Sequence, residues 1–118
     1  MARIARIAVF SVVFVLLAAG LAMADTFTCT TAYCIGTNNE DTITGTDRSQ
    51  EFFGRDGADV LRDRAGNDAD TIWGEDGRDR LNDADGDGRD ALRGGAGYDV
   101  CIGDRNDTFR GCEDVRIR

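Results

Sequence analysis

Single apolar residues recur at short, nearly regular intervals from residue 36 onward, and each stands in a segment of about three residues between stretches rich in glycine and aspartate. A three-residue segment with one apolar position predicts a short β-strand whose apolar side chain points inward. The series is Ile43, Phe52, Leu61, Ile72, Leu81, Leu92, Cys101 and Phe109. We therefore expect an all-β structure of many short strands.

The segments between these positions follow a nine-residue pattern. Residues 54–62 read glycine, x, x, glycine, x, aspartate, x, apolar, x, and residues 74–82 and 94–102 repeat that order. The alternate units 63–73 and 83–93 contain two extra residues before their aspartate. Because the excess falls in every second unit, two units should form one coil, with the longer turns on one side.

Repeats this short cannot bury an apolar face alone, so consecutive coils must stack. The predicted coils are 36–53, 54–73, 74–93 and 94–111. Two inward rows should then face each other, one of Ile43, Leu61, Leu81 and Cys101, and one of Phe52, Ile72, Leu92 and Phe109.

The first 24 residues have the features of a secretory signal peptide. Arg3 and Arg6 precede an apolar run from Ile7 to Leu21, and Ala22-Met23-Ala24 supplies small residues for cleavage. The alternative is an uncleaved membrane anchor, since the run is near the lower length limit for spanning a bilayer. We expect cleavage, a secreted protein and no membrane association afterwards.

The chain beyond the leader is strongly acidic. Two of the 14 basic residues lie in the leader, so 12 arginines and all 22 acidic residues give the rest a net charge of −10. Such a surface repels nucleic acid and attracts divalent cations. The sequence has no histidine, which removes the commonest general base and the commonest transition-metal ligand.

Four cysteines follow the leader, which fits an oxidising compartment. Of the three pairings, we favour Cys29–Cys34 and Cys101–Cys112, because each would hold one end of the stack. The alternative, a zinc site made by all four thiolates, has poor spacing.

The nonapeptide of residues 54–62, 74–82 and 94–102 resembles the hemolysin-type, or RTX, calcium-binding repeat G-G-x-G-x-D-x-U-x. The resemblance covers about Gly36 to Gly111. It implies a parallel β-roll (a β-solenoid) of about four two-nonapeptide coils, with calcium in the turns between coils. We accordingly divide the chain into a leader (1–24), an N-terminal disulfide cap (25–35) and a β-roll with a C-terminal disulfide cap (36–118).

The ligands that the resemblance implies are first Asp59, Asp79 and Asp99. The turn residues expected to take part with them are Gly54, Asp56, Gly57, Gly74, Asp76, Gly77, Gly94 and Gly97. Aspartates of the same phase stand at Asp41 and, on the other side, at Asp70 and Asp90. Gln50 replaces the aspartate in the first coil, which departs from the pattern.

The spacing of a parallel sheet also favours calcium. Neighbouring coils lie about 4.7–4.9 Å apart and calcium–oxygen bonds are about 2.3–2.6 Å long, so two aspartates of the same phase can hold one ion between them. Without the ion the same carboxylates repel. We therefore expect several calcium ions and a fold that is coupled to their binding.

The second long turn begins Asp83-Ala-Asp85-Gly-Asp87-Gly88, like an EF-hand loop. Its twelfth position would be Gly94 instead of glutamate, and no amphipathic helices flank it, so we do not expect an EF-hand. An additional calcium held by Asp85, Asp87 and Asp90 is a separate expectation.

We expect no enzymatic activity, since no histidine is present to activate Ser49 or a cysteine. The alternative to a calcium-binding protein is an extracellular structural or adhesive module with purely structural calcium, whose protein or glycan partner is unknown. Trp73, Phe53 and Tyr98 fall near outward positions and could contact such a partner or shield the roll.

Overall fold

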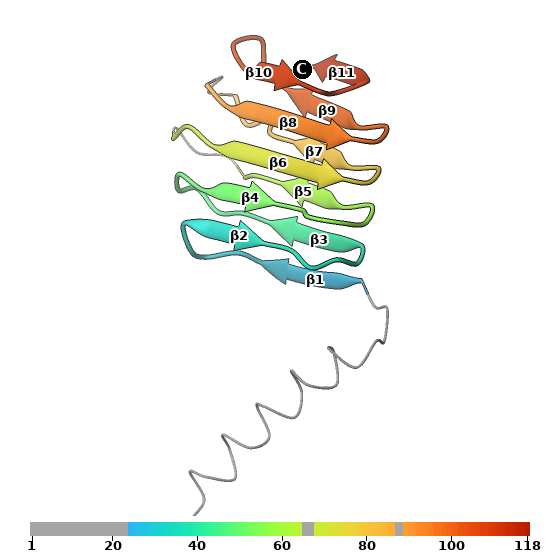
Figure 1. Cartoon of the computed structure of the whole chain (residues 1–118). Coiled ribbons are helices and arrows are strands. Elements are labelled where there is room, and N and C mark those ends of the chain that lie inside the picture. The colour runs from blue at the N-terminus through green and yellow to red at the C-terminus, as the bar shows by residue number, and fades with distance from the viewer. Residues whose placement is uncertain (1–23, 65–67, 87–88) are drawn as a thin grey trace, which may run out of the picture.

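The computed structural model describes residues 24–64, 68–86 and 89–118, and it contains two parallel β-sheets that face each other (Figure 1). The six-stranded first sheet consists of β1 (Asp25–Thr28), β3 (Asp41–Thr44), β5 (Val60–Arg62), β7 (Arg80–Asn82), β9 (Val100–Gly103) and β11 (Asp114–Ile117). The five-stranded second sheet consists of β2 (Tyr33–Ile35), β4 (Glu51–Phe53), β6 (Thr71–Asp76), β8 (Ala91–Ala96) and β10 (Thr108–Arg110).

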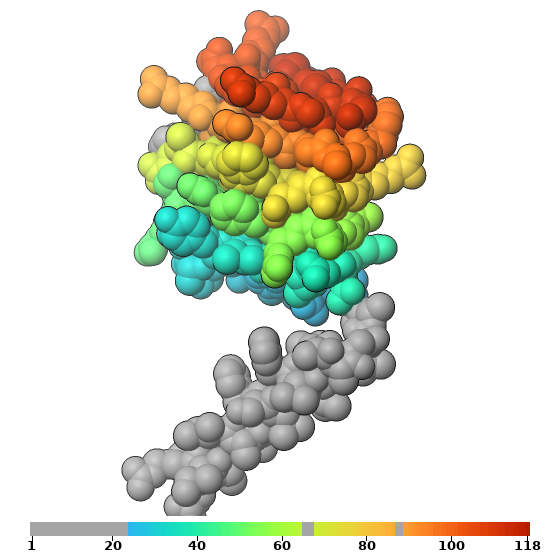
Figure 2. All heavy atoms as spheres, in the orientation of Figure 1, coloured from blue at the N-terminus to red at the C-terminus, as the bar shows by residue number. Residues whose placement is uncertain are grey.

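The chain alternates between the two sheets, so each pair of consecutive strands forms one coil of a parallel β-solenoid. The coils stack in chain order, as the colour bands in Figure 2 show. All strand pairs within each sheet are parallel and join a strand to the one a full coil away. The predicted parallel β-roll is confirmed.

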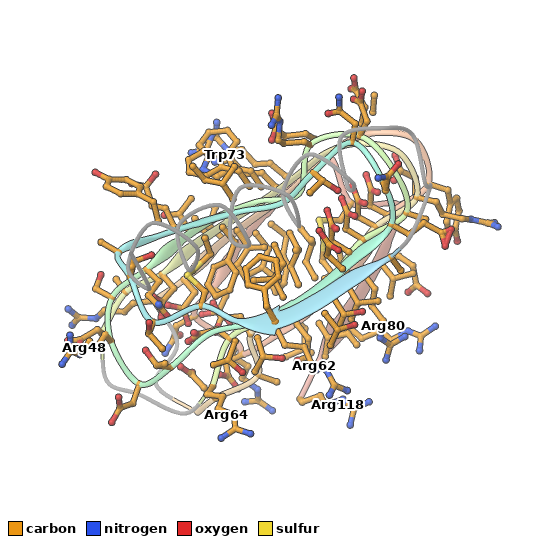
Figure 3. The ribbon with its side chains drawn as sticks, turned by 90° about the horizontal axis from the view of Figure 1, so that it is seen from below. Arg48, Arg62, Arg64, Trp73, Arg80 and Arg118 are labelled. Atoms are coloured by element: carbon orange, nitrogen blue, oxygen red, sulfur yellow. A yellow bond between two sulfur atoms is a disulfide. The ribbon has the colours of Figure 1, made fainter. Side chains whose placement is uncertain are left out.

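The core lies between the sheets and consists of the two predicted rows. In the first sheet Ile43 is paired with Leu61, Leu61 with Leu81 and Leu81 with Cys101. In the second sheet Phe52, Ile72, Leu92 and Phe109 occupy one phase of successive strands. These side chains are fully buried except Phe109, which is half-buried on the last strand of its sheet. Figure 3 shows the narrow section of the solenoid, with Trp73 on one outer face and Arg62 and Arg80 on the other.

The stack is longer than the four predicted coils. Residues 25–35, which we expected to act as a cap, form β1 and β2, and these pair in register with β3 and β4. At the other end β11 pairs with β9. The glycine and aspartate pattern is absent from these outer strands, so the repeat count missed them, although Cys34 continues the inward row of the second sheet.

Both predicted disulfides are present, one at each end of the stack. Cys29 is bonded to Cys34 in the first coil, and Cys101 of β9 is bonded to Cys112, which follows β10. Three of the four cysteines are buried in the core, so each disulfide replaces the apolar side chain that an end coil lacks.

Candidate metal sites in the turns

The turns that lead from the second sheet to the first, here called the glycine side, contain a row of buried aspartates. Asp41, Asp59, Asp79 and Asp99 occur at the same phase and are each at most 2% exposed. The Oδ1 atom of each later aspartate accepts a hydrogen bond from the backbone N–H of the aspartate one coil earlier, at 2.8–2.9 Å. These bonds fix the carboxylates in a column that runs along the solenoid.

The second oxygen of three of these carboxylates has no hydrogen-bond partner. The Oδ2 atoms of Asp59, Asp79 and Asp99 are buried and unpartnered. Asp41 differs, because its Oδ2 accepts hydrogen bonds from the backbone N–H of Thr37 at 2.6 Å and from the Thr37 hydroxyl at 3.1 Å. A buried acceptor without a donor is costly, so the three inner aspartates require another partner.

The glycines of the pattern provide the space in which these oxygens lie. A Cβ atom at Gly74 would stand 2.5 Å from Oδ2 of Asp79 and 2.7 Å from the carbonyl oxygen of Gly94 in the next coil. Gly54 has the equivalent surroundings, with Asp59 Oδ2 at 2.6 Å from the Cβ position. Carboxylate and carbonyl oxygens therefore converge at these positions, which is a donor set that suits calcium.

The electrostatics of the row agree with its burial. Burial, with smaller contributions from neighbouring acidic residues, raises the pKa of Asp59 and of Asp79 from 3.8 to about 7. Burial also raises the pKa of Asp99, with Glu113 as a second cause. Ionised carboxylates are thus unfavourable in the row unless a positive charge is bound.

The opposite turns, here called the long-turn side, contain a second row at one phase. The backbone N–H of Asp70 donates to Oδ1 of Asp90 at 2.8 Å, and that of Asp90 donates to Oδ1 of Asp107 at 2.9 Å. The row ends at Gln50, whose backbone N–H donates to Asp70.

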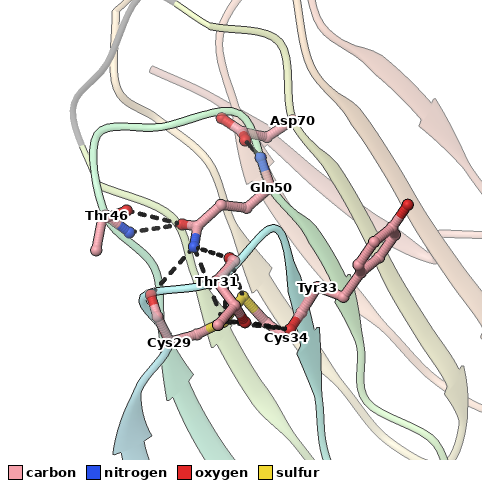
Figure 4. Close-up of a disulfide and its surroundings, with 7 residues drawn as sticks. All are labelled: Cys29, Thr31, Tyr33, Cys34, Thr46, Gln50 and Asp70. Atoms are coloured by element: carbon pink, nitrogen blue, oxygen red, sulfur yellow. Dashed lines mark hydrogen bonds between the residues drawn. A yellow bond between two sulfur atoms is a disulfide. The ribbon is translucent and has the colours of Figure 1, made fainter.

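Gln50 occupies the aspartate position in the turn between β3 and β4. The turn one coil earlier, between β1 and β2, contains no acidic residue. Its side-chain amide donates to the carbonyl oxygens of Cys29 and Thr31, at 3.1 and 2.6 Å, and its Oε1 accepts the N–H of Thr46 at 2.7 Å (Figure 4). Every hydrogen-bonding need of this side chain is met without an ion, which explains the departure from the repeat.

Two further aspartates, which the repeat pattern does not predict as ligands, lie on this side. Asp63 and Asp83 follow β5 and β7 directly, and the equivalent positions in the coils before and after them are Gly45 and Gly103. Burial raises the pKa of Asp63 to about 8 and that of Asp83 to about 10. The available signal was the replacement of a repeat glycine by aspartate in the two lengthened units only.

The remaining predicted residues are distributed as follows. Gly57, Gly77 and Gly97 have φ angles of 105°, 118° and 106°, which only glycine adopts readily, and they shape the turns. Asp56 is exposed in the turn between β4 and β5, and Asp76 is exposed at the end of β6. Asp87, like residues 1–23 of the predicted leader, lies outside the described residues.

The predicted outward aromatic residues are on the surface. Phe53 and Trp73 stack on the second sheet with ring centroids 6.3 Å apart, and the Arg93 guanidinium lies 4.5 Å from the Trp73 ring centroid. Tyr98 is 51% exposed in its turn. The Phe53, Trp73 and Arg93 side chains are partly covered by one another, so they shield the outer face of the sheet.

Comparison with known proteins gives no relative for this chain. No protein-family model, no curated protein and no solved structure matches it. The described residues include no helix of the length and apolar character that a membrane span requires.

Proposed function

We propose that this protein binds calcium ions between consecutive turns of its glycine side and that this binding is coupled to folding. One observation supports the proposal above all others: Asp59, Asp79 and Asp99 form a buried column, and each has a carboxylate oxygen without a hydrogen-bond partner. A column of buried carboxylates at coil spacing is stable only if protons or cations neutralise it.

Calcium fits this column better than other ions. The four cysteines are in disulfides and the sequence has no histidine, so the donors are oxygens, which hard cations prefer. Consecutive coils lie about 4.7–4.9 Å apart, which matches two calcium–oxygen bonds of about 2.3–2.6 Å. Magnesium requires shorter bonds of about 2.0–2.1 Å and a stricter octahedron.

Coupling to folding follows from the small core. Apart from the disulfides, each full coil contributes one inward apolar side chain per sheet, and every such coil also places carboxylates in the turns. Small domains with so few apolar side chains need additional stabilisation from disulfides or bound metal ions. An ion that binds only the folded chain stabilises the folded state. We further propose that the protein acts outside the cytoplasm, because its two disulfides fit an oxidising compartment and its leader is expected to direct export.

Circular dichroism tests the proposal directly. The purified protein without its leader, in EDTA at about pH 8, should have a weak β spectrum that increases as calcium is added toward about 1 mM, a range in which extracellular calcium modules bind. Magnesium at the same concentration is the matched control and should have a much smaller effect. An ordered spectrum in EDTA that calcium does not change, together with no heat of calcium binding, would refute the proposal.

A further inference from the structure

The two long turns bring four carboxylates together at one place on the solenoid. Asp63 and Asp70 begin and end the turn between β5 and β6, and Asp83 and Asp85 lie in the turn between β7 and β8. One carboxylate oxygen from each of the four lies within 4.8 Å of the others. This group, the four-aspartate cluster, is separated from the glycine side by the core.

Asp83 provides a second and independent observation. Its side chain is 0% exposed, and neither of its carboxylate oxygens has a hydrogen-bond partner. A fully buried carboxylate without a donor is among the costliest groups that a fold can contain. It is also one of the four groups whose oxygens converge in the cluster, so the unmet need lies where other carboxylates gather.

The fold itself does not need an aspartate at this position. The backbone N–H of Asp83 donates to the carbonyl oxygen of Ile102 at 2.8 Å, so the coil-to-coil hydrogen bond is made without the side chain. The equivalent residues, Gly45 and Gly103, lack a side chain. A Cβ atom at Gly45 would lie 2.6 Å from Oδ1 of Asp63, and one at Gly103 would lie 2.6 Å from Oδ2 of Asp107.

The cluster lies in the two lengthened turns. The turn between β3 and β4 spans residues 45–50, whereas those between β5 and β6 and between β7 and β8 span residues 63–70 and 83–90. The additional residues occur in the same two turns in which aspartate replaces the glycine. At the first position of these two turns a carboxylate therefore stands where the shorter turn has a glycine.

We infer that the four-aspartate cluster is a further cation site, distinct from the glycine-side sites, which binds one calcium ion and joins two consecutive coils. The oxygens are separated by at most 4.8 Å, and two oxygens on opposite sides of one calcium ion can be about 5.2 Å apart. Magnesium requires shorter bonds of about 2.0–2.1 Å and a near-ideal octahedron, which side chains from two separate turns meet less easily than the flexible coordination of calcium.

The electrostatics of the cluster agree with this assignment. Burial is the main cause that raises the pKa of Asp83, and Asp90, Asp63, Asp85 and Asp70 raise it further. The same low-dielectric surroundings that disfavour four isolated charges strengthen their attraction to a bound divalent ion. The site shares no ligand with the glycine-side column, since its four aspartates come from the opposite turns.

Native mass spectrometry of the protein without its leader, titrated with calcium alone, tests the inference. Asp83→Asn keeps the shape of the side chain and removes its charge, and Asp63→Asn is a second variant of the same cluster. Asp68→Asn is the matched control, because Asp68 is exposed in the same long turn and outside the cluster. Asp79→Asn reports on the glycine side.

Asp83→Asn and Asp63→Asn should each bind one ion fewer than the wild type, whereas Asp68→Asn should bind as many as the wild type. In EDTA, Asp83→Asn should be at least as stable as the wild type, since asparagine replaces a buried carboxyl group that is costly to ionise. If glycine-side binding fails, the wild type still retains one ion that Asp83→Asn loses. Equal ion counts in the wild type and both cluster variants would overturn the inference.

Discussion

Asp79 lies at the centre of the glycine-side column. Its replacement therefore tests whether the carboxylates destabilise the folded protein without calcium and stabilise it with calcium. Asn at this position keeps the Oδ1 acceptor for the N–H of Asp59, now at 2.9 Å. Its amide nitrogen would replace the unpartnered Oδ2 near the carbonyl oxygen of Gly94. Asp79→Asn therefore preserves the packing and removes one charge.

The magnitude follows from the spacing of the column. Asp59 and Asp99 are one coil away on either side, at about 4.8 Å. Each charge pair at that distance repels by about 3.5 kcal/mol at an effective dielectric constant of 20. Salt and partial protonation of the column reduce the repulsion from the two neighbours, so we expect Asp79→Asn to stabilise the calcium-free form by about 1–3 kcal/mol.

Chemical denaturation at about pH 8 measures the change, because the pKa of Asp79 is raised only to about 7 and most of the group is ionised there. In EDTA, where the wild type is expected to have little β structure, Asp79→Asn should retain more β structure and should unfold at a higher denaturant concentration. In about 1 mM calcium the order should reverse, since the variant has lost a ligand. Lower stability of the variant in both conditions would show that Asp79 is only a structural hydrogen-bonding residue, and the reasoning would fail.

Three further predictions concern pH, the glycines and the disulfides. The raised pKa values of Asp59 and Asp79, about 7, and of Asp83, about 10, favour the folded calcium-free form below the ordinary value of 3.8, and this stabilisation is lost as the pH rises through 7 to 10. In EDTA the melting temperature should accordingly rise as the pH is lowered from about 9 to about 5. In calcium it should fall over the same range, because protons displace the ion. The same trend in both buffers would contradict this prediction. Gly74→Ala should lower the unfolding free energy by more than about 2 kcal/mol, because its Cβ would stand 2.5 Å from Asp79 Oδ2 and 2.7 Å from the Gly94 carbonyl oxygen, and Gly86→Ala, with no atom within 4 Å of its Cβ, should cost only about 1 kcal/mol of backbone strain in the same urea titration. Reduction of both disulfides should cost about 2–3 kcal/mol for each short loop and leave the calcium stoichiometry unchanged, and a calorimetric titration that showed fewer ions after reduction would argue against separate roles for the ends and the turns.

Much of the fold was readable from the sequence because its repeat is local. The position of Leu61 or Leu81 in its unit is sufficient to predict that it points inward, since every coil has the same environment on both sides. The ends were harder to predict. Phe27 and Val115 occupy the inward phase on β1 and β11 without any glycine or aspartate pattern beside them, so only strand pairing identifies their coils.

The repeat positions of the candidate ligands were predictable from the sequence, whereas the hydrogen-bond partners of individual side chains were not. The aspartate column on the glycine side was expected, but the protein donors that meet the needs of Asp41 and Gln50 depend on Thr37 and on the first coil. Asp63 and Asp83 were missed because each interrupts the repeat. Their importance comes from the contact between two turns that are 20 residues apart, and no single unit contains that information.

A crystal structure determined in millimolar calcium, with calcium located by its anomalous scattering, tests the central claim most directly. We expect anomalous peaks along the column formed by Asp59, Asp79 and Asp99 and one further peak among Asp63, Asp70, Asp83 and Asp85. Well-ordered turns with no peak at either place would contradict it.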